Sequence, residues 1–381
     1  MIIYNIYNKV RAKLWTMALV MTLCSLFMVT GCTSDDVDDE EQPSGTLRLL
    51  SCSTRAGGVD EDYAFSSDGA KLWLALTKSG DNSNSNTKYG TYTYKGSTWD
   101  PTSYIKVPEP GSYYLYGVYT PNAATCAITP STDYATGAVL TISDLPSLVK
   151  DGEDPCVVVG VQGVENPTTN WGVTEGSFGY TGMKLNNQDN VHLLLDHLYA
   201  SLSFSFTIDA EYAELRTIKL KKLEIETSAT TYDKVKLTVT VTGNNTGTSP
   251  IASVAVETVE GSGTSAITTA VLFESSEGHD ISSPFPTSES LPGACFAVFA
   301  SSSADRITKL KLKSTYDVYD RKGNKIVENR ESVNALDVNA LFGSTTPDRG
   351  IRQPVKLKVN PTYLYILSDP DLDNPTITIS N

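Results

Sequence analysis

The stretch that decides the fold is Leu202-Ser203-Phe204-Ser205-Phe206-Thr207-Ile208, in which apolar and hydroxyl side chains alternate strictly. Successive side chains of a β-strand point to opposite faces, so the pattern places an apolar row on one face and a polar row on the other. A strand of this kind is half-buried, with one face against a core. The stretch therefore predicts a β-strand at the surface of a packed β-structure.

The same alternation returns along the rest of the chain. It occurs at residues 235–241, 310–318 and 355–359. In residues 218–225 the phase of the alternation slips between Leu220 and Leu223, and an extra residue in one strand of a pair is a β-bulge. We therefore predict several half-buried strands and a bulge near Lys221 and Lys222.

Other runs are apolar on both faces, at residues 72–76, 113–119, 157–161 and 294–300. Such runs are typical of central strands in a sandwich, and Gly, Pro, Asn and Ser clusters separate them as turns do. The best helical signal is the short segment 332–341. Many short strands with turns between them indicate an all-β chain of β-sandwiches. The polar stretch 186–190 marks the expected break, with an N-terminal sandwich at 46–189 and a C-terminal one at 190–381.

The first 31 residues have the features of a signal peptide. Lys9, Arg11 and Lys13 form a basic start, an apolar run follows, and the segment ends at Gly31-Cys32. Signal peptidases recognise a charged start, a short apolar stretch and a small residue before the cut. A Cys directly after that Gly is typical of a lipoprotein, so we expect lipidation of Cys32. The alternative is a transmembrane helix with an incidental Cys.

An acidic segment at residues 32–45 follows the signal. Its carboxylates crowd into residues 35–41, where like charges repel one another and bury nothing, so we expect an extended linker. The segment also resembles the surface-export signal of lipoproteins in the Bacteroidetes. The full chain carries −14, and the signal takes three positive charges with it, which leaves −17. A charge of this sign argues against nucleic acid and anionic membrane surfaces as partners.

The cysteines do not form a recognisable framework. Cys52, Cys126, Cys156 and Cys295 remain once Cys32 is lipidated, and they are far apart and contain no C-x-x-C pair. Export permits disulfides, but this spacing does not require any. Cys156 and Cys295 lie in apolar runs, so buried free thiols are the default expectation for these two.

The sequence offers no catalytic motif. It lacks HExxH, the G-x-S-x-G elbow, a Walker loop and G-x-G-x-x-G. His192 and His197 are five apart on an expected strand or turn, so they face opposite ways and make a poor metal pair. Carboxylates alternate in residues 369–373, but positions 374 and 380 lack the Gly and Glu of a calcium-binding EF-hand loop. We expect no enzymatic activity, no cofactor and no metal.

Three segments share one resemblance. Residues 113–121, YYLYGVYTP, are similar to the aromatic YAYYP strand of fimbrillin-like proteins, and residues 197–204, HLYASLSF, resemble their H-x-x-A-x-L-x-F strand. Residues 47–59, LRLLSCSTRAGGV, resemble the first strand that ends at the Arg where fimbrillin precursors are cut. Together with the lipoprotein signal, these segments extend over nearly the whole chain. The chain thus resembles the fimbrillin superfamily, the subunits and accessory proteins of Bacteroidales type V pili.

The resemblance implies two transthyretin-like β-sandwich domains in tandem and assembly by strand exchange. An Arg-specific protease would cut between Arg55 and Ala56 and remove the strand at 46–55. The exposed edge would then take a strand from another subunit. Without the resemblance, Arg55 would be read as a solvated loop residue.

The donor strand must be extended, alternating and close to a chain end. The segment 375–381 meets these conditions, with Ile377 and Ile379 on one face, and residues 355–359 are a second candidate. Each segment also has a simpler explanation, as a strand that completes the C-terminal sandwich. That explanation is favoured for residues 355–359, and for the last segment both stay open.

The sequence therefore predicts a structural or tip subunit of a cell-surface fimbria with a role in adhesion. The expected partners are other fimbrial subunits, in a homo- or heteropolymer, and a ligand on a host or bacterial surface. Before cleavage the lipid on Cys32 would hold the chain at the outer membrane. One alternative is an uncleaved lipoprotein that binds glycan through aromatic residues such as Trp73, Trp99 and Trp171. Another is an uncleaved pilus anchor or assembly factor.

Overall fold

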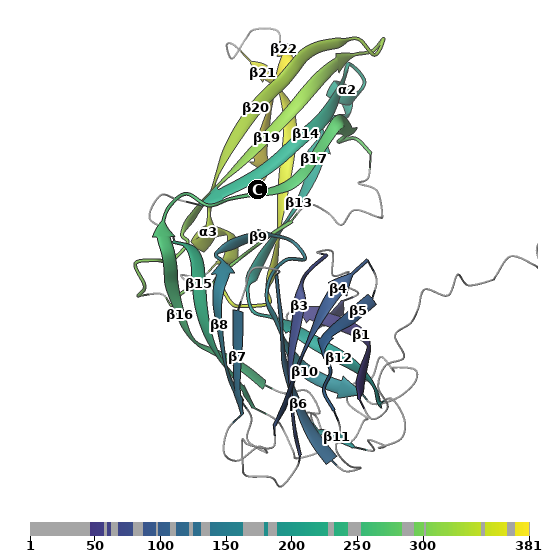
Figure 1. Ribbon diagram of the computed structural model, residues 1–381. Helices are drawn as coiled ribbons and strands as arrows, with labels where there is room; N and C mark the ends of the chain where they lie inside the picture. The colour runs from purple at the N-terminus through teal and green to yellow at the C-terminus, as the bar shows by residue number, and fades with distance from the viewer. Residues whose placement is uncertain are drawn as a thin grey trace, which may run out of the picture. The chain divides into compact units, whose positions relative to one another are not determined.

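The computed structural model is dominated by β-strands (Figure 1). It describes residues 46–56, 59–61, 68–78, 87–96, 98–106, 112–121, 125–130, 138–162, 179–181, 189–227, 232–242, 253–283, 293–300, 302–343, 347–363 and 370–380. The predicted signal peptide and acidic linker lie outside these residues. Residues Gly45–Asn381 form one compact unit, and the all-β class predicted from the alternation is confirmed.

The first sheet is built from the N-terminal part of the chain. Its strands run in the order β2 (Val59–Glu61), β1 (Leu47–Ala56), β12 (Asp189–His197), β10 (Cys156–Gln162), β6 (Ser112–Thr120), β3 (Lys71–Lys78), β4 (Lys88–Lys95) and β5 (Thr98–Ser103), and β11 (Gly179–Thr181) pairs with β6. Three of the four apolar runs predicted to be central strands are β3, β6 and β10, each with a strand on both sides. The fourth run, residues 294–300, is a strand only as far as Phe296. The sheet curls, because Thr46 forms a β-bridge with Lys106 just beyond β5.

The second sheet combines early and late strands. Its order is β16 (Ser253–Ser265), β15 (Tyr232–Thr242), β8 (Ala138–Pro146) and β7 (Thr125–Pro130). The pairing of β15 with β8 joins residues such as Leu237 and Ile142, far apart in the sequence. Figure 1 shows β15 and β16, in green, beside the blue β7 and β8.

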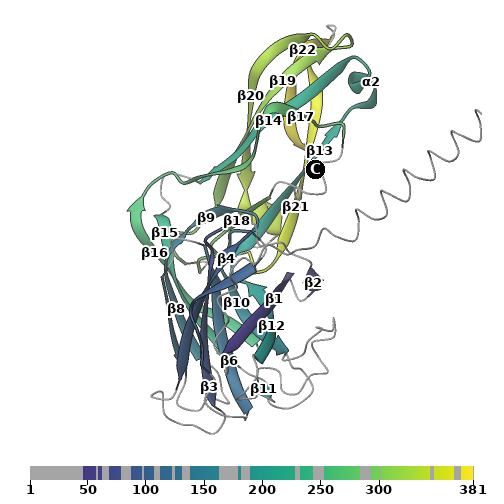
Figure 2. The ribbon, with the colours of Figure 1, turned by 45° about the vertical axis from the view of Figure 1, so that its right-hand side comes forward.

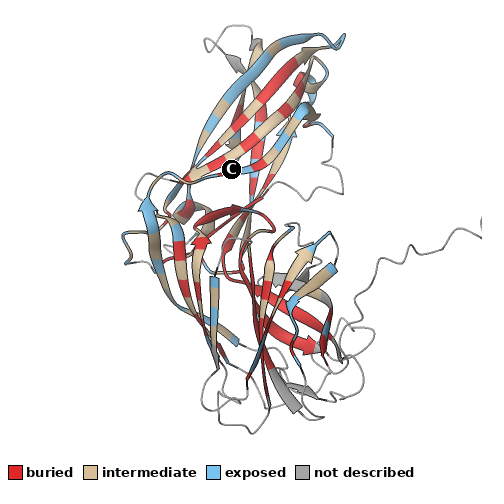
Figure 3. Cartoon of the chain, viewed as in Figure 1, coloured by how far each residue is buried: buried red, intermediate tan, exposed pale blue. Residues whose placement is uncertain are grey.

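Two further sheets face each other in the C-terminal part. The third sheet has the order β22 (Pro370–Ser380), β21 (Arg352–Tyr363), β13 (Ala200–Ile208), β18 (Gly293–Phe296) and β9 (Leu148–Lys150). The fourth has the order β17 (Thr269–Asp280), β14 (Arg216–Thr227), β19 (Lys309–Asp320) and β20 (Lys325–Asp337). Along β13, β14 and β19 buried residues alternate with more exposed ones (Figure 3), as the sequence predicted.

Two apolar cores lie on opposite faces of the first sheet. The first core includes Leu72, Leu74 and Leu76 of β3, whereas Ala75 of the same strand belongs to the second core. The second core continues under the other three sheets. Burial on both faces explains why the central strands β3, β6 and β10 lack a polar row.

Strands from both sides of the expected boundary at residues 189/190 share sheets. The boundary falls at the start of β12, which pairs with β1 and β10. The second sheet takes β7 and β8 from one side and β15 and β16 from the other, and β9 pairs with β18 in the third. The sheets thus interleave the two halves of the chain.

The helix predicted at residues 332–341 is wrong for its first part. Residues 332–337 belong to β20, which pairs with β19 over most of its length. The short helix α3 (Val338–Phe342) begins only there, capped by the Asp337 side chain and ended by Gly343 at φ 62°. The β19 ladder overrides the local helical propensity of the segment. The other short helix is α2 (Ala210–Ala213).

Candidate assembly site: the first and last strands

Strand β1 joins the first sheet mainly through β12. The two strands run parallel, from Leu47 opposite Asp189 to Arg55 opposite Asp196, with one irregularity between Leu49 and Ser51. Figure 2 shows β1, in purple, beside β12. The beginning of β1 closes the curl of the sheet, since the Leu47 amide donates to the Ile105 carbonyl at 2.9 Å and the Tyr92 hydroxyl donates to the Leu47 carbonyl at 2.8 Å.

The side chains of β1 fill part of the first core. Leu47 is fully buried and Leu49 is 7% exposed, and the partly buried Cys52 packs against the same core. Burying a leucine side chain stabilises the fold by about 1.5–3 kcal/mol. Removal of β1 would therefore leave an apolar slot with unpaired backbone groups along β12.

The backbone at Arg55 is paired on both sides. Arg55 lies opposite Asp196 of β12 and opposite Asp60 of β2, and Ala56 is the last residue of β1. Three residue pairs hold β2 to β1, namely Thr54 with Glu61, Arg55 with Asp60 and Ala56 with Val59. The bond between Arg55 and Ala56 thus lies in paired backbone. A protease that binds its substrate as an extended strand must first displace the short β2.

The last strand, β22, is an edge strand of the third sheet. It pairs with β21, and Ile377 is 1% exposed while Ile379 is partly buried against the second core. On its other side, Ser332 Oγ and Asn334 Nδ2 of β20 both donate to the Ile377 carbonyl at 2.9 Å. The structure thus places Ile377 and Ile379 in the chain's own sandwich.

The second donor candidate lies inside its sheet. Val355, Leu357 and Val359 belong to β21, which runs parallel to β13 on one side and antiparallel to β22 on the other. All three side chains are buried. Residues 355–359 therefore complete the C-terminal sandwich, the simpler of their two explanations.

The structure describes the four cysteines of the folded part, but it does not describe every residue singled out from the sequence. Cys32 and Trp171 lie outside the described residues. Cys156 and Cys295 are buried free thiols as expected, and Cys52 and Cys126 are partly buried free thiols. Among the described residues, no helix has the length and hydropathy needed to cross a membrane.

The tryptophans of the described residues make contacts within the chain. Trp73 Nε1 donates to Thr120 Oγ1 at 2.9 Å, and Lys71 Nζ lies 5.6 Å from its ring centroid. The Trp99 ring packs against Tyr94 and Tyr119, with centroids 5.2 and 6.2 Å apart. Both indole rings therefore pack against residues of the chain's own sandwich.

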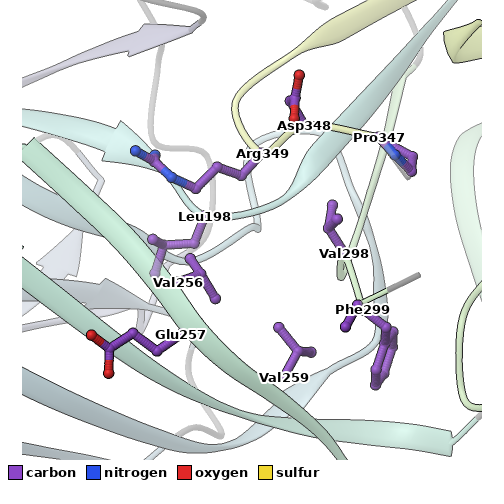
Figure 4. Close-up of a pocket in the computed structure, with 10 residues that line it drawn as sticks. Leu198, Val256, Glu257, Val259, Val298, Phe299, Pro347, Asp348 and Arg349 are labelled. Atoms are coloured by element: carbon purple, nitrogen blue, oxygen red, sulfur yellow. The ribbon is translucent and has the colours of Figure 1, made fainter. Parts of the chain in front are cut away.

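A pocket of about 340 Å³ lies beside the edge strand β16 (Figure 4). Apolar side chains from β16 and from residues 298–300 form its walls, and Arg349 reaches across one side. The Arg349 guanidinium is engaged, since it donates to Asp196 Oδ2 and to the carbonyls of His197 and Val254. Phe299, the aromatic residue of the lining, is 1% exposed, so the pocket offers no open ring for a sugar to stack on.

Sequence reasoning missed one cluster of polar side chains. His197 is buried as expected, and its ring contacts the side chains of Asp154 and Cys156. The pattern Asp-x-Cys facing a His across a strand pair would have indicated the cluster. The partners could not be chosen from the sequence, because the ladder between β10 and β12 joins residues about 40 apart.

The interleaved sheets define an all-β sandwich protein whose first described strand, β1, is paired with β12 and β2. Neither a family model nor a curated protein matches the sequence. Among solved structures, the chain is similar to a fimbrial protein from Bacteroides vulgatus, at 11% identity and a TM-score of 0.34, over 88% of this chain and 98% of that one.

Two further solved structures are similar to this chain. One is a proposed cell adhesion protein from Bacteroides ovatus, at 11% identity and a TM-score of 0.36, over 89% of this chain and 97% of that one. The other is the tip fimbrial protein Mfa3 from Porphyromonas gingivalis with a C-terminal truncation, at 10% identity and a TM-score of 0.27, over 88% and 99%. At these TM-scores the likenesses are partial, and the fold assignment rests on the sheets described above.

Proposed function

We propose that this chain is a structural or tip subunit of a cell-surface fimbria with a role in adhesion. It is exported as a lipoprotein through Cys32, cut after Arg55 and joined to other subunits by strand exchange. The observation that carries the proposal is the position of β1. A single cut between Arg55 and Ala56 falls at the end of this strand and separates it covalently from every other strand.

The energetics of β1 are compatible with replacement. After the cut, β1 is held by the β12 ladder, the contacts of Leu47 with Ile105 and Tyr92, and the burial of its two leucines. Parallel pairing is slightly less stable per residue than antiparallel pairing. An incoming strand that offers apolar side chains at the same spacing can regain about 1.5–3 kcal/mol for each one buried.

The last strand supplies a matching pattern. Ile377 and Ile379 are two residues apart, as are Leu47 and Leu49, and β22 lies at the edge of its sheet. To act as a donor, β22 must leave β21 and give up the hydrogen bonds from Ser332 and Asn334. A neighbouring subunit that offers a longer ladder would compensate for these losses.

The test compares two arginines of the same strand. Arg55→Ala should abolish processing, so that protein recovered from the cell surface keeps its lipidated N terminus and forms no SDS-resistant ladders. Arg48→Ala, on the exposed face of β1, is the matched control and should be processed and assembled like the parent chain. N-terminal sequencing and unheated gels give both readouts.

The opposite results reject the proposal. If parent protein from the cell surface is intact back to Cys32 and monomeric, the strand-exchange mechanism is excluded. An intact, monomeric protein that binds a polysaccharide would instead be a glycan-binding lipoprotein. An intact protein found at the base of fibres made by other subunits would be an anchor.

A further inference from the structure

Three buried side chains with metal-ligating atoms converge where β10 and β12 meet. Asp154 lies just before β10, Cys156 is its first residue, and His197 is the last residue of β12 and pairs directly with Cys156. His197 Nδ1 lies 2.7 Å from Asp154 Oδ2 and 3.4 Å from Cys156 Sγ. The three ligand atoms all lie within 4.8 Å of one another.

The cluster is closed off from solvent. Asp154 and Cys156 are each 1% exposed and His197 is 6% exposed. Asp154 Oδ1 is buried, and among the described residues it has no hydrogen-bond donor. A buried acceptor left without a partner costs about 1–3 kcal/mol, and more when it is charged, so this oxygen calls for a donor or a cation.

The arrangement does not suit nucleophilic catalysis. Burial raises the pKa of the Cys156 thiol to about 11, although the nearby His197 lowers it in part. A reactive cysteine needs a lowered pKa and access to a substrate. Since the cluster is also closed off from any substrate, a protease-like triad does not account for it.

We propose that Asp154, Cys156 and His197 form a binding site for Zn²⁺ within the first sheet. Thiolate, imidazole and carboxylate are the three ligand types that Zn²⁺ takes in proteins, and a thiolate disfavours Ca²⁺ and Mg²⁺. One thiolate, one carboxylate and a neutral imidazole balance the dipositive ion. The resulting buried site carries no net charge.

The required movement is small. Tetrahedral zinc with bonds of about 2.0–2.3 Å sets its ligand atoms roughly 3.3–3.6 Å apart. The distance between Cys156 Sγ and His197 Nδ1 is already 3.4 Å, and the Asp154 to His197 contact must widen from 2.7 Å. The proton that joins Asp154 and His197 would give way to the ion.

The ion would stiffen the sheet beside the candidate assembly site. β12 is the strand on which β1 lies, and the cluster ties the end of β12 to the beginning of β10. The zinc proposal does not depend on cleavage at Arg55 or on strand exchange. Each can fail while the other stands.

The test uses Co²⁺ as a spectroscopic substitute for Zn²⁺. The chain without its predicted signal peptide, and with Cys32→Ser to remove a competing thiol, is freed of metal with a chelator and titrated with Co²⁺. We expect a thiolate-to-cobalt charge-transfer band in the near ultraviolet that saturates at one equivalent and disappears when Zn²⁺ is added. Cys156→Ser should lose the band.

A second buried cysteine supplies the matched control. Cys295 is also a buried free thiol beside a carboxylate, Asp151, but it lies outside the cluster, so Cys295→Ser should keep the band. Asp154→Asn should weaken binding in a chain whose circular dichroism is unchanged. No band in the folded parent chain, or an equal band in Cys156→Ser, would overturn the proposal. If Cys156→Ser does not fold, the parent chain and Asp154→Asn decide.

Discussion

At the scale of single residues, the two-faced burial of the first sheet leaves no room for side chains at some positions. Gly117 of β6 lies between β3 and β10. A Cβ atom there would come 2.5 Å from Leu74 Cδ2 and 2.8 Å from Val158 Cγ2. The neighbours belong to the close-packed first core, so they can yield only by leaving their rotamers.

We therefore expect Gly117→Ala to destabilise the protein. The overpacking should lower the free energy of unfolding by about 1–3 kcal/mol. Urea denaturation followed by circular dichroism gives the value. Lys88→Ala, at an exposed position of β4, is the control and should change stability by less than about 0.5 kcal/mol. A stable Gly117→Ala protein would show that the first core is looser than the packing indicates.

A buried carboxylate organises an irregular part of the β19–β20 ladder. Asp317 is fully buried, its Oδ1 accepts from the Asn329 amide at 2.8 Å, and its Oδ2 lies 3.0 Å from Lys325 Nζ. Asn329 has a φ of 52°, and the register of the ladder shifts close by. Burial raises the pKa of Asp317, but the Asn329 amide and the Lys325 ammonium outweigh it and lower this pKa below its ordinary value of 3.8.

The sign of this shift fixes a pH dependence. Because the pKa of Asp317 is lowered in the folded state, its stabilisation is present above the ordinary pKa and is lost as pH falls through the folded-state value. Asp317→Asn should cost about 1.5–3 kcal/mol at pH 7, and this difference should shrink below pH 3.8. Urea titrations from neutral pH to about pH 3 would show it. A difference that does not change with pH would contradict the assignment.

At the scale of elements, the proposed cut after Arg55 would change what β1 contributes to the stability of the fold. In the precursor, Leu47→Ala should lower the free energy of unfolding by about 2–5 kcal/mol, because it leaves a cavity in the first core. If β1 leaves the fold once the chain is cut after Arg55, the same substitution should have no effect on the stability of the cut protein. Arg48→Ala serves as the neutral control. An equal effect in both forms would mean that β1 stays bound.

The positions of many strands could be predicted from the sequence. The alternation at residues 202–208, 235–241 and 310–318 predicted β13, β15 and β19, and the phase slip at Lys221 and Lys222 predicted a bulge that both ladders of β14 show. These signals are local. The side chains along one strand report directly on the faces of that strand.

What failed depended on partners distant in the sequence. Residues 332–337 belong to the segment that was predicted to be helical, yet the ladder with β19 makes them a strand. The pairing of Leu237 with Ile142 has no local signal, because many apolar strands would fit equally well. The same holds for His197, whose neighbours Asp154 and Cys156 are set by the ladder between β10 and β12.

At the scale of the whole molecule, the shared sheets predict cooperative unfolding. All tryptophans of the mature chain precede residue 189, so their fluorescence reports on the N-terminal half. Val239→Ala removes apolar contacts in β15, which pairs with β8. We expect it to cost about 0.5–3 kcal/mol and to shift the fluorescence and circular dichroism transitions together. Two separate transitions, with fluorescence unaffected, would show that the halves unfold independently.

The pairing of β8 with β15 would also set an order of events during the proposed export. A chain that crosses a membrane N terminus first delivers Ile142 well before Leu237. Until Leu237 arrives, the second sheet is half built and the edge of β8 is open to other chains. In a chain exported as proposed, a pause between the delivery of the two strands would therefore favour aggregation, and rapid translocation would prevent it.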